Sequence, residues 1–387
     1  MAANRLRHLI PFLLEQGHRV HVICPRLGDE SIPTHPHLHI HSLSSITNRT
    51  DFRSKLGRKA LFPFLGAWIG WGVARAVDEL YVVSSIPEVE AWVIGFGVKL
   101  LFPNKVRLTV EVRDPFSMNS LYPWGCLRKG FYHVLERRLL SRADQLIFLT
   151  TKIQELYRKT FPGSRIVQNH SVVITNGFDP ATHHSVPRPD GNRIQITHVG
   201  TFYGDRNPLV FLSALEEVLK NGDMAKRLEV RFVGTVHGED LSRAIRAKED
   251  SLSSGTIIHW EGPVGHARAL EAMQDSDINL LITHTTGSEY AIPGKLFEYL
   301  GAGKPILALT SDPLVVELLD RLNAGWVCSG AQDLISWFRT HLAHPEAVRS
   351  RTLDPALLKP YHWSNIHQRW AEFVTFQHNQ YNPPTAR

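Results

Sequence analysis

The segment GSEYAIPGKLFEYLGAGKPILAL, residues Gly287 to Leu309, is the most informative part of the chain. It predicts a loop, then a helix from about Lys295 to Ala302, and then a buried strand that follows Pro305. A helix N-terminus attracts phosphate through its free N–H groups and partial positive charge, and Lys295 adds a full charge there. Glu298, one turn into the helix, can accept hydrogen bonds from ribose or sugar hydroxyls. The segment therefore indicates a nucleotide-sugar site, although an ordinary charged pair on a helix is the simpler alternative.

Length and composition limit the class of protein. A chain of 387 residues is too long for one compact core, so two domains are expected. Three widely spaced cysteines argue against a disulfide framework or a zinc site, and they favour the cytoplasm. The net charge of +6 favours anionic partners such as nucleotides or phospholipid surfaces. Nucleic acid is not expected as a partner, because the chain has no zinc-finger spacing, aromatic RNA-binding motif or long Lys/Arg block.

Short apolar runs alternate with helical patterns along the chain, which predicts parallel, doubly wound sheets. Strands are expected at Arg19–Cys24, Tyr81–Ser84, Arg107–Val112 and Gln145–Leu149, and, after a polar segment, at Gln195–Val199, Glu229–Val233, Thr256–Trp260, Ile278–Ile282, Pro305–Leu309 and Gly325–Val327. The fold class is thus α/β, with two Rossmann-like domains facing across a cleft. We predict an N-terminal domain at 1–180, a linker at 181–192, a second domain at 193–350 and a helical tail at 351–387.

One segment has the character of a membrane contact. The basic residues Arg49, Arg53, Lys55, Arg58 and Lys59 precede an uncharged run, 60–74, which contains Phe62, Phe64, Trp68 and Trp71. The run is shorter than the ~20 residues that span a bilayer. A buried helix and a basic-aromatic patch on anionic lipid remain as alternatives. A buried helix is expected, because core helices are the commoner source of such runs, and contact with the inner face of the membrane is left open.

Two further positions carry chemistry. Gly200 and Thr201 follow a predicted strand, and their loop leads to Arg206, which could bind a diphosphate with two hydrogen bonds. A turn glycine beside a solvated arginine is the alternative. Arg113 and Asp114 follow another predicted strand, where they could anchor an acceptor hydroxyl or form an internal ion pair.

Three tempting motifs fail. The segment GAGKP, residues 301–305, lacks the Ser or Thr of a P-loop. The segment Asp275–Asp277 is predicted to be a helix-to-strand turn rather than a metal-binding DxD motif. His35, His37, His39 and His41 alternate on one face of a predicted exposed strand, with side chains ~7 Å apart, which is too far for adjacent pairs to chelate one ion. No metal site is expected.

These motifs resemble those of the group 1 retaining glycosyltransferases of the GT-B fold, family 4-like. The GKLFEYLGAGKP motif at 294–305 carries the resemblance, together with the RDPF element at 113–116, which is similar to the RDPW element of one branch. The resemblance implies sugar transfer from a nucleotide-diphosphate donor to a glycan or lipid-linked acceptor, with retention and without a metal or cofactor, in cell-envelope or extracellular polysaccharide biosynthesis. It also implies catalytic roles for Arg113, Asp114 and Glu289. The donor-binding residues that it implies are Gly200, Thr201, Arg206, Pro263, Val264, Gly294, Lys295, Leu296 and Glu298.

The chain departs from the family pattern in two places. The Glu-x7-Glu motif would place its first acid at Tyr290, and the nearest acid is Glu289. Family members also open with a strand and a glycine-rich loop before the helix that corresponds to 4–16. We therefore expect the N-terminal sheet to lack a central strand, because the true start lies upstream. A nucleotide-sugar epimerase and a non-catalytic homologue that acts as a binding subunit are the alternatives.

Overall fold

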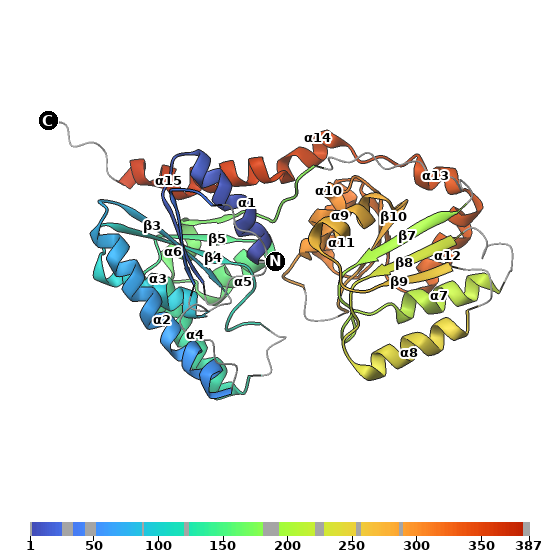
Figure 1. Ribbon diagram of the computed structural model, residues 1–387, viewed down its shortest axis with the longest axis horizontal. Helices are drawn as coiled ribbons and strands as arrows, with labels where there is room; N and C mark the ends of the chain where they lie inside the picture. Colours follow the sequence, from blue (N-terminus) through green and yellow to red (C-terminus); the bar gives the residue numbers. More distant parts are fainter. Residues whose placement is uncertain are drawn as a thin grey trace. The chain divides into compact units, whose positions relative to one another are not determined.

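The computed structural model describes residues 2–24, 34–42, 52–86, 89–119, 124–180, 193–220, 228–252, 257–285 and 289–381 (Figure 1). The chain divides into two compact units. The first combines Met1–Thr175 with Ser364–Arg387, and the second is Asn176–Trp363. The expected boundary was at residue 180, and the C-terminal helix was expected to form a separate tail. This helix is instead part of the first unit, where the Phe373 carbonyl accepts a hydrogen bond of 2.8 Å from Gln145.

The first unit has its parallel strands in two separate sheets. Its strands are β1 (Val20–Cys24), β2 (Leu38–Ser42), β3 (Leu80–Ile86), β4 (Val106–Val112), β5 (Gln145–Phe148) and β6 (Ser171–Val173). One sheet has the order β1-β2 and the other β3-β4-β5-β6. Among the described residues no strand pairs the two sheets, and the missing central strand stays a prediction. The short strand β6 was not predicted.

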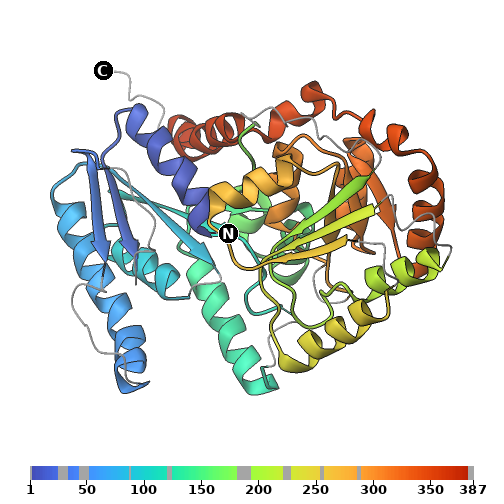
Figure 2. The same cartoon turned by 45° about the vertical axis from the view of Figure 1, so that its right-hand side comes forward.

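Helices join the two sheets of the first unit. They are α1 (Ala2–Glu15), α2 (Phe52–Arg75), α3 (Val89–Leu101), α4 (Cys126–Leu140), α5 (Thr151–Thr160), α6 (Arg165–Asn169) and α15 (Trp363–Tyr381). Ile23 of β1 packs with Phe62 of α2 and Ile94 of α3, and Figure 2 shows the dark-blue strands β1 and β2 beside α2. Arg5 of α1 forms a buried ion pair of 2.7 Å with Glu111 of β4.

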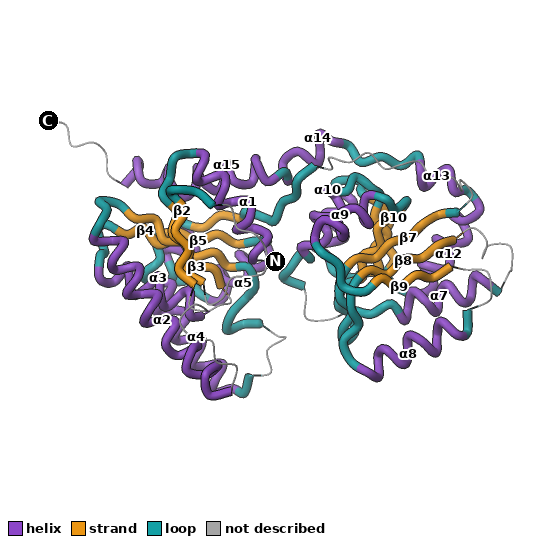
Figure 3. The backbone as a smooth tube through the Cα atoms, in the orientation of Figure 1, coloured by secondary structure: helices purple, strands orange, loops and turns teal. Residues whose placement is uncertain are grey.

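The second unit is one doubly wound parallel sheet. Its strands are β7 (Ile194–Val199), β8 (Leu228–Val233), β9 (Ile257–Glu261), β10 (Ile278–Ile282), β11 (Ile306–Leu309) and β12 (Gly325–Cys328), in the order β12-β11-β10-β7-β8-β9. Helices α7 (Leu209–Leu219), α8 (Glu239–Asp250) and α12 (Ala331–Ala343) cover one face. Helices α9 (His266–Gln274), α10 (Gly294–Gly301) and α11 (Pro313–Arg321) cover the other (Figure 3). The short helices α13 (Pro345–Arg349) and α14 (Pro355–Leu358) and the 3-10 turn η3 (Lys359–Tyr361) lead to α15.

The expectation of a buried helix at 60–74 is wrong. Phe62 is only 7% exposed, but Phe64 and Trp68 on the same helix are 75% and 67% exposed. The reason is the pair Gly66 and Gly70, since a Cβ on either would lie 2.3 or 2.5 Å from side-chain atoms of α3. The glycine face therefore packs against α3, and the aromatic face points outward. Of the helices that the structure describes, none is long and apolar enough to cross a membrane.

The histidine row is only partly a strand. β2 begins at Leu38, so His35 and His37 precede it, and only His39 and His41 lie on it. His41 is half-buried and lies 3.1 Å from the His21 ring on β1. Within the described ranges no group of three or more His, Cys, Asp or Glu side chains could hold a metal ion. The Asp275–Asp277 segment is the expected turn, and Asp277 accepts a hydrogen bond of 2.8 Å from the Gln195 backbone.

Candidate functional site

The candidate donor site lies where the strand order of the second unit reverses. The chain builds β8 and β9 on one side of β7, and β10, β11 and β12 on the other. In doubly wound sheets ligands bind at the carboxyl ends of the strands beside such a switch point. Gly200 and Thr201 directly follow β7, and α10 follows β10. The expected phosphate loop and the expected phosphate-binding helix thus meet at this point.

The absence of a side chain at Gly200 makes room for Lys295. Gly200 has φ +137°, which favours glycine, and a Cβ there would lie 2.3 Å from Lys295 Nζ. Gly234 at the end of β8 packs as closely on Gly200, since a Cβ on Gly234 would lie 2.2 Å from the Gly200 carbonyl oxygen. Only glycines fit at this close approach.

His198 accepts a hydrogen bond from the Lys295 ammonium. The imidazole is fully buried, with Nδ1 2.9 Å from the Leu280 carbonyl oxygen and Nε2 3.3 Å from Lys295 Nζ. A carbonyl only accepts, so Nδ1 carries the proton and Nε2 accepts from Lys295. Burial, and then the charge of Lys295, hold the pKa of His198 well below its ordinary value, so the ring stays neutral.

Two cations lie together here. Arg206 donates to the Thr201 carbonyl at 3.2 Å, and its guanidinium lies 5.1 Å from the Tyr203 ring centroid. Its buried Nε has no hydrogen-bond partner among the described residues. Burial, and then the charge of Arg206, hold the pKa of Lys295 well below its usual range, while Glu298 acts in the opposite direction. Two crowded cations of this kind are suited to an anion with two negative groups.

Asp205 holds the phosphate loop in place through contacts that were not predicted from the sequence. Asp205 accepts hydrogen bonds from the Thr285 backbone at 2.8 Å and hydroxyl at 2.5 Å, and it contacts His284. Partial burial works against the charged carboxylate, but these hydrogen bonds prevail and lower the pKa of Asp205. The loop after β7 is therefore tied to the loop after β10. About 80 residues separate the partners, so no local sequence pattern could indicate the contact.

Hydrogen bonds near both ends of α10 hold the helix in place. The Tyr299 hydroxyl accepts from the Val199 backbone at 2.9 Å and lies 3.2 Å from the Leu280 carbonyl oxygen. The Leu296 side chain is fully buried, and its N–H donates to the Pro293 carbonyl at 2.9 Å. The Leu296 N–H is thus already used, so we assign phosphate binding at the start of the helix to the backbone N–H groups of Gly294 and Lys295.

The other predicted site residues lie on several elements of the two units. Pro263 and Val264 follow β9, two strands from β7, and Val264 packs against the core. Glu289 is exposed and affects Asp312, whose pKa is raised mainly by burial and also by the Glu289 charge. Arg113 and Asp114 follow β4 in the first unit and are half-buried.

A buried acid that was not predicted as a site residue supports the loop after Asp114. Glu136 of α4 is fully buried, accepts from the Ser117 backbone at 3.2 Å and contacts the Ser117 and Tyr157 hydroxyls. Burial raises its pKa, in opposition to these hydrogen bonds. Glu136 is therefore a structural anchor of the loop.

Two family models match the chain. Residues 2–177 match the model described as "Glycosyl transferase 4-like domain", and residues 212–371 match the one described as "Glycosyl transferase-like". The chain belongs to the GT-B glycosyltransferases. The loop that carries Gly200 and Arg206 lies between the two matched ranges of this glycosyltransferase, so its assignment depends on the geometry. No curated protein matches the chain in sequence.

Solved structures share the glycosyltransferase fold at low sequence identity. OtsA in its apo form is 11% identical with a TM-score of 0.67, over 96% of this chain and 95% of that one. Sucrose-phosphate synthase from Thermosynechococcus elongatus is 15% identical with a TM-score of 0.65, over 97% and 93%. Alr3699/HepE from Anabaena, in complex with UDP and glucose, is 16% identical with a TM-score of 0.60, over 88% and 86%. These similarities show the GT-B fold.

Proposed function

We propose that this glycosyltransferase moves a sugar from a nucleotide-diphosphate sugar to a glycan or lipid-linked acceptor, with retention, in cell-envelope or extracellular polysaccharide biosynthesis. The observation that carries the donor class is the pair of crowded cations, Lys295 and Arg206, at the switch point of the second unit. The UDP and UDP-glucose complexes of Alr3699/HepE support it by analogy of fold. No metal or cofactor is needed in this scheme.

Each residue has a role in the proposed reaction. Arg206, Lys295 and the helix-start N–H groups stabilise the negative charge that develops on the departing diphosphate. Glu298 accepts hydrogen bonds from the ribose hydroxyls. Thr201, Gly294, Pro263 and Val264 complete the donor site through backbone groups, Glu289 contacts the transferred sugar, and Arg113 and Asp114 serve the acceptor.

The donor assignment is tested with a thermal-shift screen against UDP-, GDP-, ADP- and dTDP-sugars. The wild type should be stabilised by one of these donors, and Lys295→Ala and Glu298→Ala should lose most of that shift. Lys220→Ala is the matched control, because Lys220 is exposed and forms an ion pair with Glu217 on the surface. Equal shifts in the wild type and both site variants would contradict the assignment.

We also propose that the first unit contacts anionic membrane. Leu61, Phe64, Trp68 and Trp71 of α2 are 36% to 75% exposed and repeat at helical spacing. The basic residues Arg53, Lys55, Arg58 and Lys59 belong to the same helix. Apolar and aromatic side chains beside clustered positive charge are typical of helices that lie in the lipid interface. A second stripe, Leu127, Phe131 and Val134 of α4, is exposed by 58% to 94%.

Vesicle co-sedimentation tests this surface. The wild type should bind phosphatidylglycerol vesicles more strongly than phosphatidylcholine vesicles, and Phe64→Ser/Trp68→Ser should reduce binding about tenfold or more. Leu357→Ser is the control, because Leu357 is 41% exposed in the second unit. A wild type that ignores both vesicles, or one whose α2 stripe is covered in a dimer that the double variant dissolves, would overturn the proposal.

A further inference from the structure

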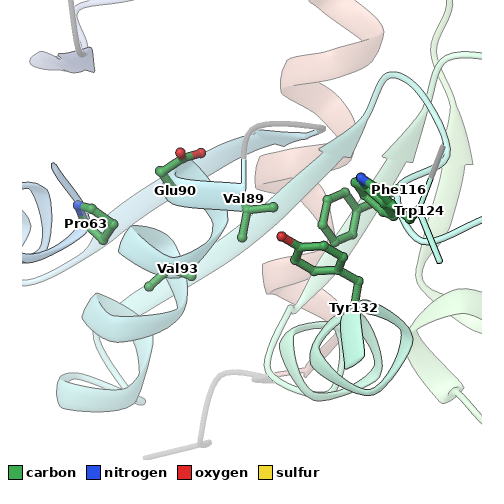
Figure 4. Close-up of a pocket in the computed structure, with 7 residues that line it drawn as sticks. All are labelled: Pro63, Val89, Glu90, Val93, Phe116, Trp124 and Tyr132. Atoms are coloured by element: carbon green, nitrogen blue, oxygen red, sulfur yellow. The ribbon is translucent and has the colours of Figure 1, made fainter. Parts of the chain in front are cut away.

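The first unit contains an aromatic cavity that the donor site does not use. It has a volume of about 320 Å³ and is lined by Pro63 of α2, by Val89, Glu90 and Val93 of α3, by Phe116 and Trp124, which lie between β4 and α4 in the chain, and by Tyr132 of α4 (Figure 4). Ligand cavities begin at about 300 Å³, so this one is suited to a small group.

Three aromatic side chains form one wall of the cavity. The ring centroid of Phe116 lies 5.5 Å from that of Trp124 and 5.1 Å from that of Tyr132, and Trp124 lies 4.5 Å from Tyr132. The Arg128 guanidinium lies 5.4 Å from the centroids of both Trp124 and Tyr132. The rings therefore hold one another in place and offer a preformed apolar surface to a ligand.

A carboxylate lies on the opposite side. Figure 4 shows Glu90 and Val89 above the hollow, Val93 and Pro63 beside it, and the Tyr132 hydroxyl directed into it. Glu90 is half-buried in the first turn of α3, and no described residue pairs with its carboxylate. The wall residues Val89 and Phe116 closely follow β3 and β4, so the cavity lies at the carboxyl ends of these parallel strands, where doubly wound units bind ligands.

We propose that this cavity binds one sugar ring of the acceptor, and this inference rests on the proposed glycosyl transfer. The C–H groups on the face of a saturated ring carry partial positive charge and suit the negative faces of aromatic rings. The hydroxyl groups at the ring edge donate to the Glu90 carboxylate. A hydrocarbon chain fits less well, because it would strip water from the carboxylate and supply no hydrogen-bond donor in return.

Saturation-transfer NMR with methyl glycosides of glucose, galactose, mannose and N-acetylglucosamine, without nucleotide present, tests the proposal. One of these probes should bind, with signals strongest on its ring C–H groups. Trp124→Ala and Glu90→Gln should each weaken that binding about tenfold. Trp124→Phe should retain more of it, which separates loss of the aromatic surface from misfolding.

Matched controls separate this site from the others. Trp68→Ala removes an exposed tryptophan outside the cavity and should leave glycoside binding unchanged. Lys295→Ala should lose UDP binding and retain glycoside binding, whereas Trp124→Ala should show the reverse, so failure of the donor site and failure of this site are distinguishable. The proposal is overturned if no glycoside binds, if Trp124→Ala and Glu90→Gln bind as tightly as the wild type, or if decan-1-ol binds there in place of the sugars.

Discussion

Replacement of Gly200 by alanine should disable the donor site through Lys295. Gly200 has φ +137°, so a side chain there costs about 1–3 kcal/mol of backbone strain. In a unit of this size that cost lowers the melting temperature by roughly 2–12 °C. The new Cβ must also move Lys295 Nζ from 2.3 Å to at least 3.4 Å away, a shift of about 1.1 Å.

That shift should weaken UDP binding. Loss of one hydrogen bond between a charged group and the diphosphate costs about 1.5–3 kcal/mol. Affinity should therefore fall roughly 10- to 150-fold, as measured by isothermal titration calorimetry with UDP. Because His198 accepts from the same ammonium, the displaced lysine also leaves its supporting partner.

Gly238→Ala is the control for strain alone. Gly238 has φ +104°, and the nearest heavy atom to an added Cβ is Leu241 Cβ at 4.0 Å. This variant should be destabilised while it binds UDP with wild-type affinity. If Gly200→Ala is destabilised to the same degree and still binds UDP as tightly as the wild type, then Lys295 does not contact the diphosphate as proposed.

Four further predictions concern buried groups. The pKa of Lys295 lies well below 10.5 in the unliganded protein, and diphosphate binding should raise this pKa. Binding at pH values between the lowered pKa and 10.5 should therefore take up a proton. Calorimetry in two buffers of different ionisation enthalpy measures this uptake, and Lys295→Ala should abolish it. In the same pH window Lys295 should make the unliganded protein more stable as pH rises, since the unfolded chain binds the proton that the native state lacks. Arg5→Met leaves buried Glu111 without its ion-pair partner and should cost about 3–5 kcal/mol in urea unfolding, and a variant as stable as the wild type would show that this pair does not hold α1. Tyr157→Phe removes a donor to buried Glu136 and should cost about 1–3 kcal/mol without a change in UDP affinity; an affinity change would assign the pair more than a structural role.

Most of the fold followed from the sequence. The predicted bounds of β4, β7 and β10 agree with the structure to within one residue, because short apolar and β-branched runs give strong local signals. The strand β6 was not predicted because it is only three residues long, whereas the predicted histidine strand agrees with β2 from Leu38 onward. The error at α2 has a different cause. Gly66 and Gly70 form its packing face, and a glycine gives no apolar signal in a sequence.

The candidate site was predicted less completely. Gly200, Arg206 and Lys295 were expected to act together, and the structure brings them to one place. The roles of His198 and Asp205 depend on partners 79 to 97 residues away, and such contacts leave no local pattern. Buried strands of parallel sheets are usually apolar throughout, but the strand of His198 also contains Gln195 and Thr197, so its polar residues do not single out His198.

The break between β1 and β3 has a consequence for local unfolding. The backbone ladder that would couple β1 and β2 to β3–β6 is interrupted among the described residues, so side-chain packing on α2 and the Arg5–Glu111 pair carry that coupling. Side-chain packing without backbone hydrogen bonds couples the unfolding of two sheets only weakly. We therefore expect the β1–β2 pair to unfold locally as its own cooperative unit. Native-state hydrogen exchange should show its amides losing protection well before those of β4 and β5.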